Sequence, residues 1–229
     1  PKELNVHYKN SGLIRHGVNN HEIFIDAGKI GPNYLPGHAH ADNLTFELSI
    51  HGKRAIVDTG ISTYEICKRR SFERSTSAHN TVAIDGKNQS DVWASFRVAR
   101  RVFPEKISCS VDNETFSFSG SYTSKKHVRN IIWSGNRISI KDNVSKIKDI
   151  AESFLHFHPS INIVKKNDQY YGTFLNQKLF LICIKSQSEH EIEKYDYCEG
   201  YNKVTCAQRL RFFSIGESLH NFDIVLEIL

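Results

Sequence analysis

Residues 44–50 read Leu44-Thr45-Phe46-Glu47-Leu48-Ser49-Ile50, with an apolar side chain at every second position. A period of two is typical of a β-strand that has one buried face and one solvated face. The pair His51-Gly52 follows, and a second apolar run covers residues 55–58. We therefore predict a β-hairpin that turns at His51-Gly52.

Short runs of this kind recur along the whole chain. Asp85-Gly86 and Gly135-Asn136 interrupt further pairs of runs and predict two more turns. Only residues 65–72 are a candidate for a short helix or a loop excursion, and no longer segment has a helical period. Many short strands separated by turn signals indicate an all-β fold, which we expect to be a large antiparallel β-sandwich. The other predicted strands are 23–26, 81–84, 115–119, 131–133, 138–140, 154–157, 179–184, 209–213 and 222–228.

The length and composition favour one domain over residues 1–229, because 229 residues suffice for the core of one large β domain. The chain begins with Pro1 and contains no Met, so we expect it to be part of a longer protein with an upstream domain. No apolar run approaches the roughly 20 residues that span a bilayer. Five scattered cysteines without a C-x-x-C pair do not predict a disulfide scaffold.

The formal net charge is +5, and basic residues gather at three places. A positive surface favours an acidic partner, although Lys and Arg also serve as solvated residues at strand edges. Nucleic acid is the weaker interpretation, since no zinc-finger spacing, basic helix or RNA-binding aromatic signature is present, and an acidic polysaccharide fits better. The basic clusters are Lys68, Arg69, Arg70 and Arg74; Arg97, Arg100 and Arg101; and Lys125, Lys126 and Arg129.

The densest group of chemically active side chains is Gly37-His38-Ala39-His40-Ala41-Asp42-Asn43, directly before the first strong strand. Residues two apart in an extended segment point the same way, so His38 and His40 can face one pocket. His79 stands at the start of another predicted strand, and Asp58 ends the run 55–58. Two His and one carboxylate suit Zn²⁺, in a structural or a catalytic site, whereas a single His is more often an ordinary hydrogen-bonded residue.

Three blocks carry a family resemblance: Pro36-Gly37-His38-Ala39-His40-Ala41-Asp42-Asn43-Leu44-Thr45-Phe46-Glu47, Ile56-Val57-Asp58-Thr59-Gly60 and Arg74-Ser75-Thr76-Ser77-Ala78-His79-Asn80-Thr81-Val82. The order and the amino-acid sequence of these blocks resemble those of the heparinase II/III-like polysaccharide lyases, and the resemblance covers roughly residues 11–144. The resemblance implies a C-terminal β-sandwich that follows a missing N-terminal α/α toroid domain, with the active cleft between the two. It also implies zinc held by His40, Asp58 and His79, and His38 lining the cleft.

The reaction that the resemblance implies is β-elimination on a polysaccharide containing uronic acid. His38 would offset charge that builds on the uronate carboxylate, or would transfer a proton. The family's main base and acid lie largely on the toroid, so we expect this chain alone to be inactive. A periplasmic or extracellular location follows from the resemblance only.

Five further residues are candidates for the cleft. Tyr64 lies in the stretch where some family members carry an additional cleft Tyr, so we list it as catalytic. Arg74 has the planar fork of donors that pairs with a carboxylate or sulfate, but such an Arg equally often stabilises its own loop. Trp93 and Arg97, with Phe96 between them, can stack on or pair with sugar rings, although aromatic residues in strands more often pack in the core.

Two other kinds of protein fit parts of the pattern. A cupin-like metalloenzyme would use His38, His40 and His79 with Glu47, rather than Asp58, as ligands, but Glu47 lies in an ordinary alternating strand. A noncatalytic carbohydrate-binding module would use a metal only to hold loops together and its basic face to hold a glycan.

Overall fold

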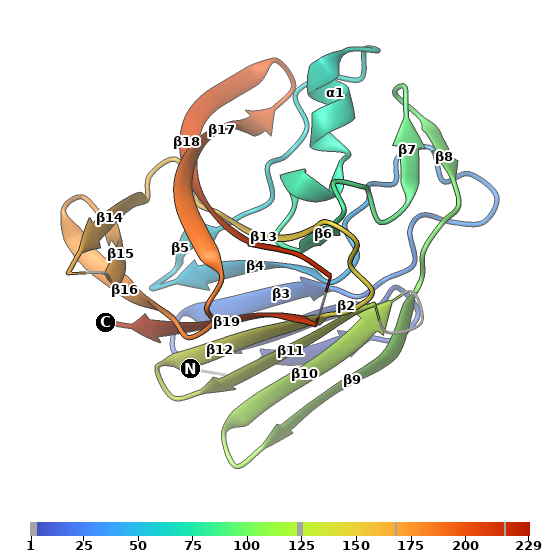
Figure 1. The fold of residues 1–229 in the computed structure, drawn as a ribbon. Coiled ribbons are helices and arrows are strands. Elements are labelled where there is room, and N and C mark those ends of the chain that lie inside the picture. Colours follow the sequence, from blue (N-terminus) through green and yellow to red (C-terminus); the bar gives the residue numbers. More distant parts are fainter. Residues whose placement is uncertain (1–3, 123–125, 168, 218) are drawn as a thin grey trace.

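The computed structural model describes residues 4–122, 126–167, 169–217 and 219–229 (Figure 1). Nearly all its regular structure is antiparallel strand, which confirms the predicted all-β sandwich. The exceptions are the one-and-a-half-turn helix α1, Lys68–Glu73, and the short 3₁₀ helix Thr76–Ala78. Neither of these helices is long and apolar enough to cross a membrane. Lys125, part of the third basic cluster, lies outside the described residues.

The first sheet has five antiparallel strands that follow one another along the chain. The His51-Gly52 turn between its last two strands is present, and both residues have positive φ angles, of 51° and 70°. Two consecutive residues with positive φ define the tight type I′ hairpin turn, which matches the twist of its strands. The strands are β1 Leu4–Tyr8, β2 Leu13–Val18, β3 His21–Asp26, β4 Thr45–Ile50 and β5 Lys53–Ile56.

The second sheet has eight strands in the order β14-β15-β16-β19-β12-β11-β10-β9. The C-terminal strand β19 pairs with β12 on one side and with β16 on the other, so it joins the two halves of this sheet. The strands are β9 Pro104–Asp112, β10 Thr115–Tyr122, β11 His127–Ser134, β12 Arg137–Val144, β14 Asn162–Lys166, β15 Gln169–Phe174, β16 Gln177–Ile184 and β19 His220–Ile228.

Two smaller sheets complete the architecture. A four-stranded sheet has the order β17-β18-β13-β6, and its long β17–β18 hairpin rises above the sandwich beside α1 (Figure 1). A two-stranded hairpin, β7–β8, stands at the same end of the molecule. The strands are β6 Val82–Ile84, β7 Asp91–Trp93, β8 Arg97–Ala99, β13 Ile150–His156, β17 Glu189–Gly200 and β18 Lys203–Ile215.

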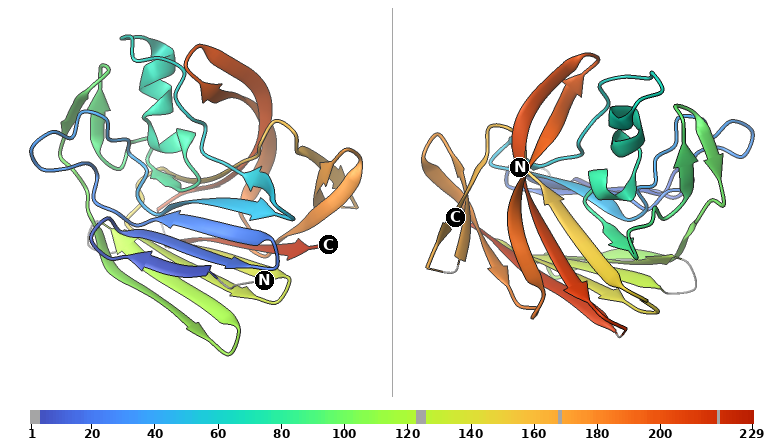
Figure 2. Two further views of the ribbon diagram at one scale, coloured as in Figure 1. Left: turned by 180° about the vertical axis from the view of Figure 1, so that it is seen from behind. Right: turned by 45° about the horizontal axis from the view of Figure 1, so that its top comes forward.

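One continuous core joins the three larger sheets, and the two views of Figure 2 show the first sheet stacked on the second. The inward-facing residues of β4, such as Phe46, meet Trp133 of β11, Phe222 of β19 and Leu210 of β18 in this core. All four side chains are at most 1% exposed. Burial of apolar area of this extent is the main force that holds the sheets together.

The basic clusters differ from the expectation of a positive surface. Arg70, Arg74 and Arg129 are each at most 1% exposed, so these three charges do not contribute to a positive surface. Arg129 is paired with the buried Asp142 inside the sandwich. The physical reason is that an Arg surrounded by carbonyl and carboxylate acceptors satisfies its donors without water.

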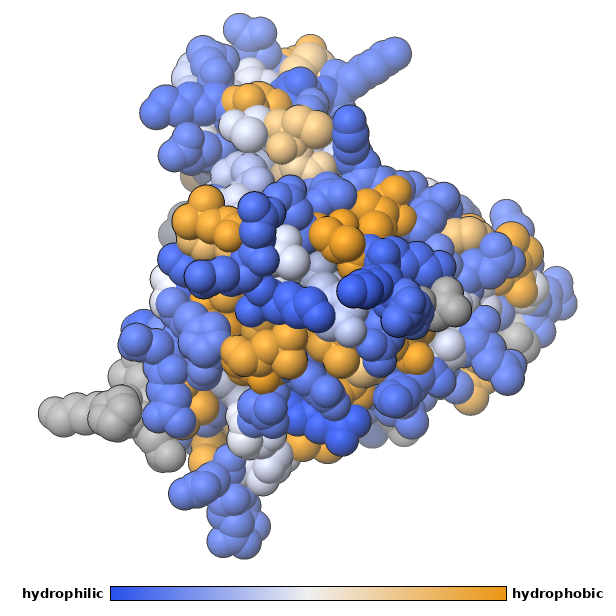
Figure 3. Space-filling model, turned by 90° about the vertical axis from the view of Figure 1, so that its left-hand side faces the viewer, coloured by the Kyte–Doolittle hydropathy of each residue, from blue (hydrophilic) through white to orange (hydrophobic). Residues whose placement is uncertain are grey.

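Figure 3 views the molecule from the side on which Figure 1 shows β14–β16. Apolar side chains on this face form separate patches among hydrophilic ones. Scattered patches of this kind are normal for a protein surface and do not by themselves mark a binding site.

Candidate functional site

Three loops bring the predicted site residues to one end of the sandwich. His38, His40 and Asp42 lie in the long connection between β3 and β4. Asp58 lies two residues beyond β5, and His79 follows the 3₁₀ helix that precedes β6. Because β3, β4 and β5 are neighbours in one sheet, their connections start from a shared rigid edge.

His79 and Asp58 form the tightest contact of this site. The Nδ1–H group of His79 donates to Oδ2 of Asp58 over 2.5 Å, since a carboxylate only accepts. Oδ1 of Asp58 accepts from the backbone N–H of Gly60 over 2.9 Å. Nε2 of His79 is buried and has no hydrogen-bond partner among the residues that the structure describes. A buried ring nitrogen without a protein partner, on a His whose other nitrogen is held by a carboxylate, is an arrangement found in metal-binding His residues.

His40 and Asp42 lie next to His79. One potential ligand atom from each of these three residues lies within 4.8 Å of the other two, and no other such group of three occurs among the described residues. The rings of His40 and His79 are 5.3 Å apart between centroids. Two imidazoles and a carboxylate are the donor set that Zn²⁺ prefers, so these side chains fit the predicted ion.

The electrostatic environment shifts the pKa values of the clustered side chains in different directions. Burial, together with the charge of His79, lowers the pKa of His40 to about 3. Burial raises the pKa of Asp42 to about 7. Burial also opposes the charge on Asp58, but the charge and hydrogen bond of His79 outweigh it and lower that pKa. His40 is therefore neutral at physiological pH, which is the form that binds a metal.

His38 is exposed, whereas His40 is buried, yet both line the same cavity of about 330 Å³. Asp26 and Asp42 also line this cavity. Both His of the H-x-H motif therefore line one pocket, while their roles stay predictions. The ring of His38 additionally contacts that of Tyr64, with 5.7 Å between the ring centroids, so both predicted catalytic residues lie together.

Arg70 of α1 places a buried positive charge beside the cluster. Its Nη1 donates to Nε2 of His40 over 3.4 Å, and its Nη2 donates to the backbone carbonyl of Ser95. The guanidinium also lies over the ring of Tyr64, at 5.1 Å from the ring centroid. This charge offsets the nearby carboxylates and connects α1 to the loop that carries His40.

Arg74 has a different position from the one expected of a substrate ligand. It is fully buried, and its guanidinium donates to the backbone carbonyls of Ala39, Trp93, Ala94 and Arg97 over 3.0 to 3.3 Å. The substrate-binding prediction for Arg74 is therefore corrected, and the alternative, that this Arg stabilises its own loops, holds. The reason is that the guanidinium makes five hydrogen bonds to backbone carbonyls and so has used its five N–H donors.

Trp93 and Arg97 face each other across the β7–β8 hairpin. Trp93 is half-exposed and Arg97 is exposed. Since Arg74 holds the backbone carbonyls of both residues, this hairpin is tied to the loop of His40. Both side chains remain available to a ligand, and their predicted role in substrate binding stays a prediction.

Glu47 has no part in the cluster. Its carboxylate lies on the solvent side of β4, where it pairs with Arg54 over 2.9 Å. The cupin-like alternative required Glu47 as a metal ligand and is therefore wrong.

Two functional candidates were missed by the sequence analysis. Asp42 continues the period of two that begins at His38 and His40, so the same argument would have placed it in the pocket. Arg70 had no such signal, because only the folding of α1 against the loop brings it to His40.

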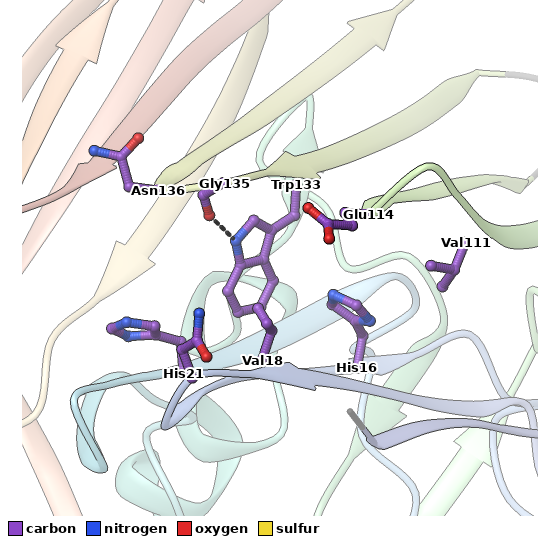
Figure 4. Close-up of a pocket in the computed structure, with 9 residues that line it drawn as sticks. His16, Val18, His21, Val111, Glu114, Trp133, Gly135 and Asn136 are labelled. Atoms are coloured by element: carbon purple, nitrogen blue, oxygen red, sulfur yellow. Dashed lines mark hydrogen bonds between the residues drawn. The ribbon is translucent and has the colours of Figure 1, made fainter. Parts of the chain in front are cut away.

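A larger cavity, of about 470 Å³, lies at a distance from this site, between β2–β3 and the β9–β12 part of the second sheet. Figure 4 shows Trp133 at its centre, with His16, His21 and Glu114 around it. The ring of His16 stacks on Phe116, and the indole N–H of Trp133 donates to Gly135 of its own turn. These side chains serve the packing of the two sheets.

Comparison with known proteins gives one family. The model of the family "Heparinase II/III-like, C-terminal" matches residues 1–224. A heparin-sulfate lyase of Bacteroides stercoris is 39% identical over 64 residues, which are 26% of this chain and 10% of that protein.

Solved structures with a similar fold include heparan sulfate lyases and heparinase III proteins. A heparan sulfate lyase of Pedobacter heparinus superimposes with a TM-score of 0.80 and 17% identity, over 100% of this chain and 37% of that one. A heparinase III gene product superimposes with a TM-score of 0.78 and 18% identity, over 100% of this chain and 36% of that one. Similarity at this level of identity establishes the fold, and the chain spans little more than a third of these proteins.

Proposed function

Since the chain belongs to the heparinase II/III-like C-terminal family, we propose that it is the β-sandwich portion of a polysaccharide lyase. The substrate class is acidic polysaccharide that contains uronic acid, and the reaction is β-elimination. The observation that carries this proposal is the meeting of exposed His38 with buried His40 and Asp42 in one cavity beside His79.

In β-elimination a base removes the C5 proton of the uronate. The electron pair forms the C4–C5 double bond, and the 4-linked oxygen leaves with the rest of the chain. Negative charge builds on the uronate carboxylate as the proton departs, so a positioned hydrogen-bond donor lowers the barrier. His38 supplies this donor at the mouth of the cavity, where its exposed ring reaches a ligand.

We propose that His40, Asp58 and His79 hold Zn²⁺, with Asp42 as a further carboxylate within reach. The orphaned Nε2 of His79 supports the ion. A bound Zn²⁺ would supply fixed positive charge and would hold the three loops together. Asp58 would then orient His79 through Nδ1 or rotate to bind the ion directly.

Further parts of the proposal concern the whole protein. The base and acid that complete the reaction would come from an N-terminal α/α toroid domain, which would close the cleft over His38. Without that domain the chain would be inactive. We place the protein in the periplasm or outside the cell, where such polysaccharides are degraded.

The test is turnover by the full-length protein and its His38→Ala variant. The unsaturated product absorbs in the ultraviolet, so addition of the protein to heparan sulfate, heparin or alginate should raise the absorbance. His38→Ala should lower kcat by about 100-fold or more and leave the melting temperature unchanged. Glycan binding without any product, in the parent protein, would overturn the lyase proposal and favour a noncatalytic binding module.

A further inference from the structure

Three exposed aromatic rings stand in a row beside His38. Tyr64 lies in the segment between β5 and α1, Phe96 in the turn of the β7–β8 hairpin, and Tyr201 in the turn of the β17–β18 hairpin. Figure 1 shows α1 and both hairpins at the same end of the molecule. We refer to Tyr64, Phe96 and Tyr201 as the aromatic wall.

The rings of the wall are in contact. The ring centroids of Tyr64 and Phe96 are 5.8 Å apart, and those of Tyr64 and Tyr201 are 6.4 Å apart, with interplanar angles of 17° and 26°. His38 meets both Tyr64 and Phe96 edge-on. The row therefore begins at the candidate cavity and leads away from it to Tyr201.

The wall is rigidly supported although its rings are exposed. The tip of the β17–β18 hairpin is bound to the loop of Tyr64, because Asn202 N–H donates to the carbonyl of Ser62 over 2.8 Å. Cys198 N–H donates to the carbonyl of Thr59 over 2.7 Å. These bonds fix the backbone of the hairpin tip, and with it the position of Tyr201, against the loop that carries Tyr64.

All three rings of the wall are exposed to solvent. Tyr64, Phe96 and Tyr201 are 41%, 47% and 59% exposed. Packed but solvated aromatic rings at a cavity mouth gain free energy when a ligand with an apolar face covers them. The C–H face of a pyranose ring is such a surface.

We propose that the aromatic wall is a sugar subsite of the proposed lyase, and that Tyr201 at its outer end contacts a pyranose ring at a distance from the scissile bond. This inference rests on the proposed function for the substrate class, and it assigns a role to the β17–β18 hairpin. A ligand bound at His38 would lie next to the wall, because His38 touches two of its three rings.

The test compares Tyr201→Ala and Tyr201→Phe in the full-length protein on heparan sulfate chains of defined length. For long chains, Tyr201→Ala should raise KM about tenfold and leave kcat within about twofold, whereas Tyr201→Phe keeps the ring and should behave like the parent. The rise in KM should vanish on the shortest chain that is cleaved, since such a chain does not reach Tyr201. Leu175→Ala, at another hairpin turn and 79% exposed, is the matched control.

An equal change of KM at every chain length would overturn the subsite, because it would indicate that Tyr201 acts by docking a neighbouring domain. An unchanged KM in Tyr201→Ala would overturn it as well. Binding of the same chains to His38→Ala protein, with and without Tyr201→Ala, does not require turnover. If the double variant binds the chains more weakly than His38→Ala does, the sugar subsite is supported even if no lyase activity is found. If the two proteins bind the chains equally well, the subsite is refuted.

Discussion

Arg129 and Asp142 form a bidentate ion pair inside the sandwich, with Nε–Oδ1 and Nη2–Oδ2 distances of 2.7 and 2.8 Å. Both side chains are 1% exposed. The remaining Nη1 of Arg129 donates to the backbone carbonyls of Leu44 and Asn80. These two residues adjoin the segments that carry Asp42 and His79, so the ion pair helps to fix the backbone of the candidate site.

Removal of Arg129 should therefore be severe. Arg129→Met leaves the carboxylate of Asp142 buried without its main partner, and we expect the free energy of unfolding to fall by about 3–5 kcal/mol. Urea denaturation measures this change. Arg100→Met is the matched control, because the Arg100–Asp91 pair is exposed and screened and its loss should be hardly detectable. Similar losses in the two variants would contradict the role assigned to Arg129.

The metal content should depend on the clustered residues. Elemental analysis of the purified protein should find about one zinc per chain. His40→Ala and His79→Ala should abolish binding, and Asp58→Asn should weaken it by about 10–100-fold if Asp58 acts through His79, or abolish it if Asp58 is a ligand. Asp42→Asn tests the further carboxylate.

Glu47→Gln is the control for the metal series. Its side chain pairs with Arg54 on the solvent face of β4, so its substitution should leave the zinc content unchanged. Absence of metal from the parent protein, or its loss in Glu47→Gln, would refute the assigned ligands.

Stability should decline on mild acidification because of His127. This residue is fully buried and donates to Asp142 through Nε2, while no group in the described part of the chain bonds to its Nδ1. Burial lowers the pKa of His127 in the folded state, although Asp142 opposes the change. The unfolded chain therefore binds the proton first, and stability that is fully present above pH 6.5 is lost as the pH falls toward the folded-state pKa.

For one such His the loss at pH 5 is at most about 2 kcal/mol. Urea denaturation between pH 8 and pH 5 should show a smaller dependence on pH in His127→Gln than in the parent. His156→Gln should act in the same direction, because burial lowers the pKa of His156 strongly. Asp142, whose pKa is lowered despite burial by Arg129 and His127, should lose its contribution only in strong acid. An unaltered pH dependence in His127→Gln would contradict this account.

Gly60 should be required for the docking of the β17–β18 hairpin. Its φ angle is +79°, and a Cβ atom there would lie 2.1 Å from the carbonyl oxygen of Cys198. Gly60→Ala should lower the free energy of unfolding by more than about 2 kcal/mol and displace Tyr201 from Tyr64.

Comparison with Gly52→Ala distinguishes the steric clash with Cys198 from the strain of a positive φ angle. Gly52 has a similar φ angle, +70°, but a Cβ atom there would meet nothing within 4 Å. Its substitution should cost only about 1 kcal/mol. Equal losses in the two glycine variants, measured by urea denaturation, would show that the contact with Cys198 does not matter.

The strands with regular alternation were predictable, because side chains two apart lie on the same face whatever the rest of the fold does. The run 44–50 and its His51-Gly52 turn correspond to β4 and the hairpin to β5. The helix predicted at 65–72 is α1, Lys68–Glu73. Eight strands were not predicted, namely β1, β2, β7, β8, β9, β14, β15 and β17.

The sequence by itself determined the all-β class and the residue types of the site, because strand periodicity and the spacing of His38, His40 and Asp42 are local properties of the chain. Only the tertiary structure decided which charges are buried and which distant residues meet. Arg74 stabilises loops through hydrogen bonds to a remote segment, and the ring of Tyr201 contacts that of Tyr64 although the two residues are far apart in the sequence. Such contacts depend on how the sheets pack, and no local pattern records that packing.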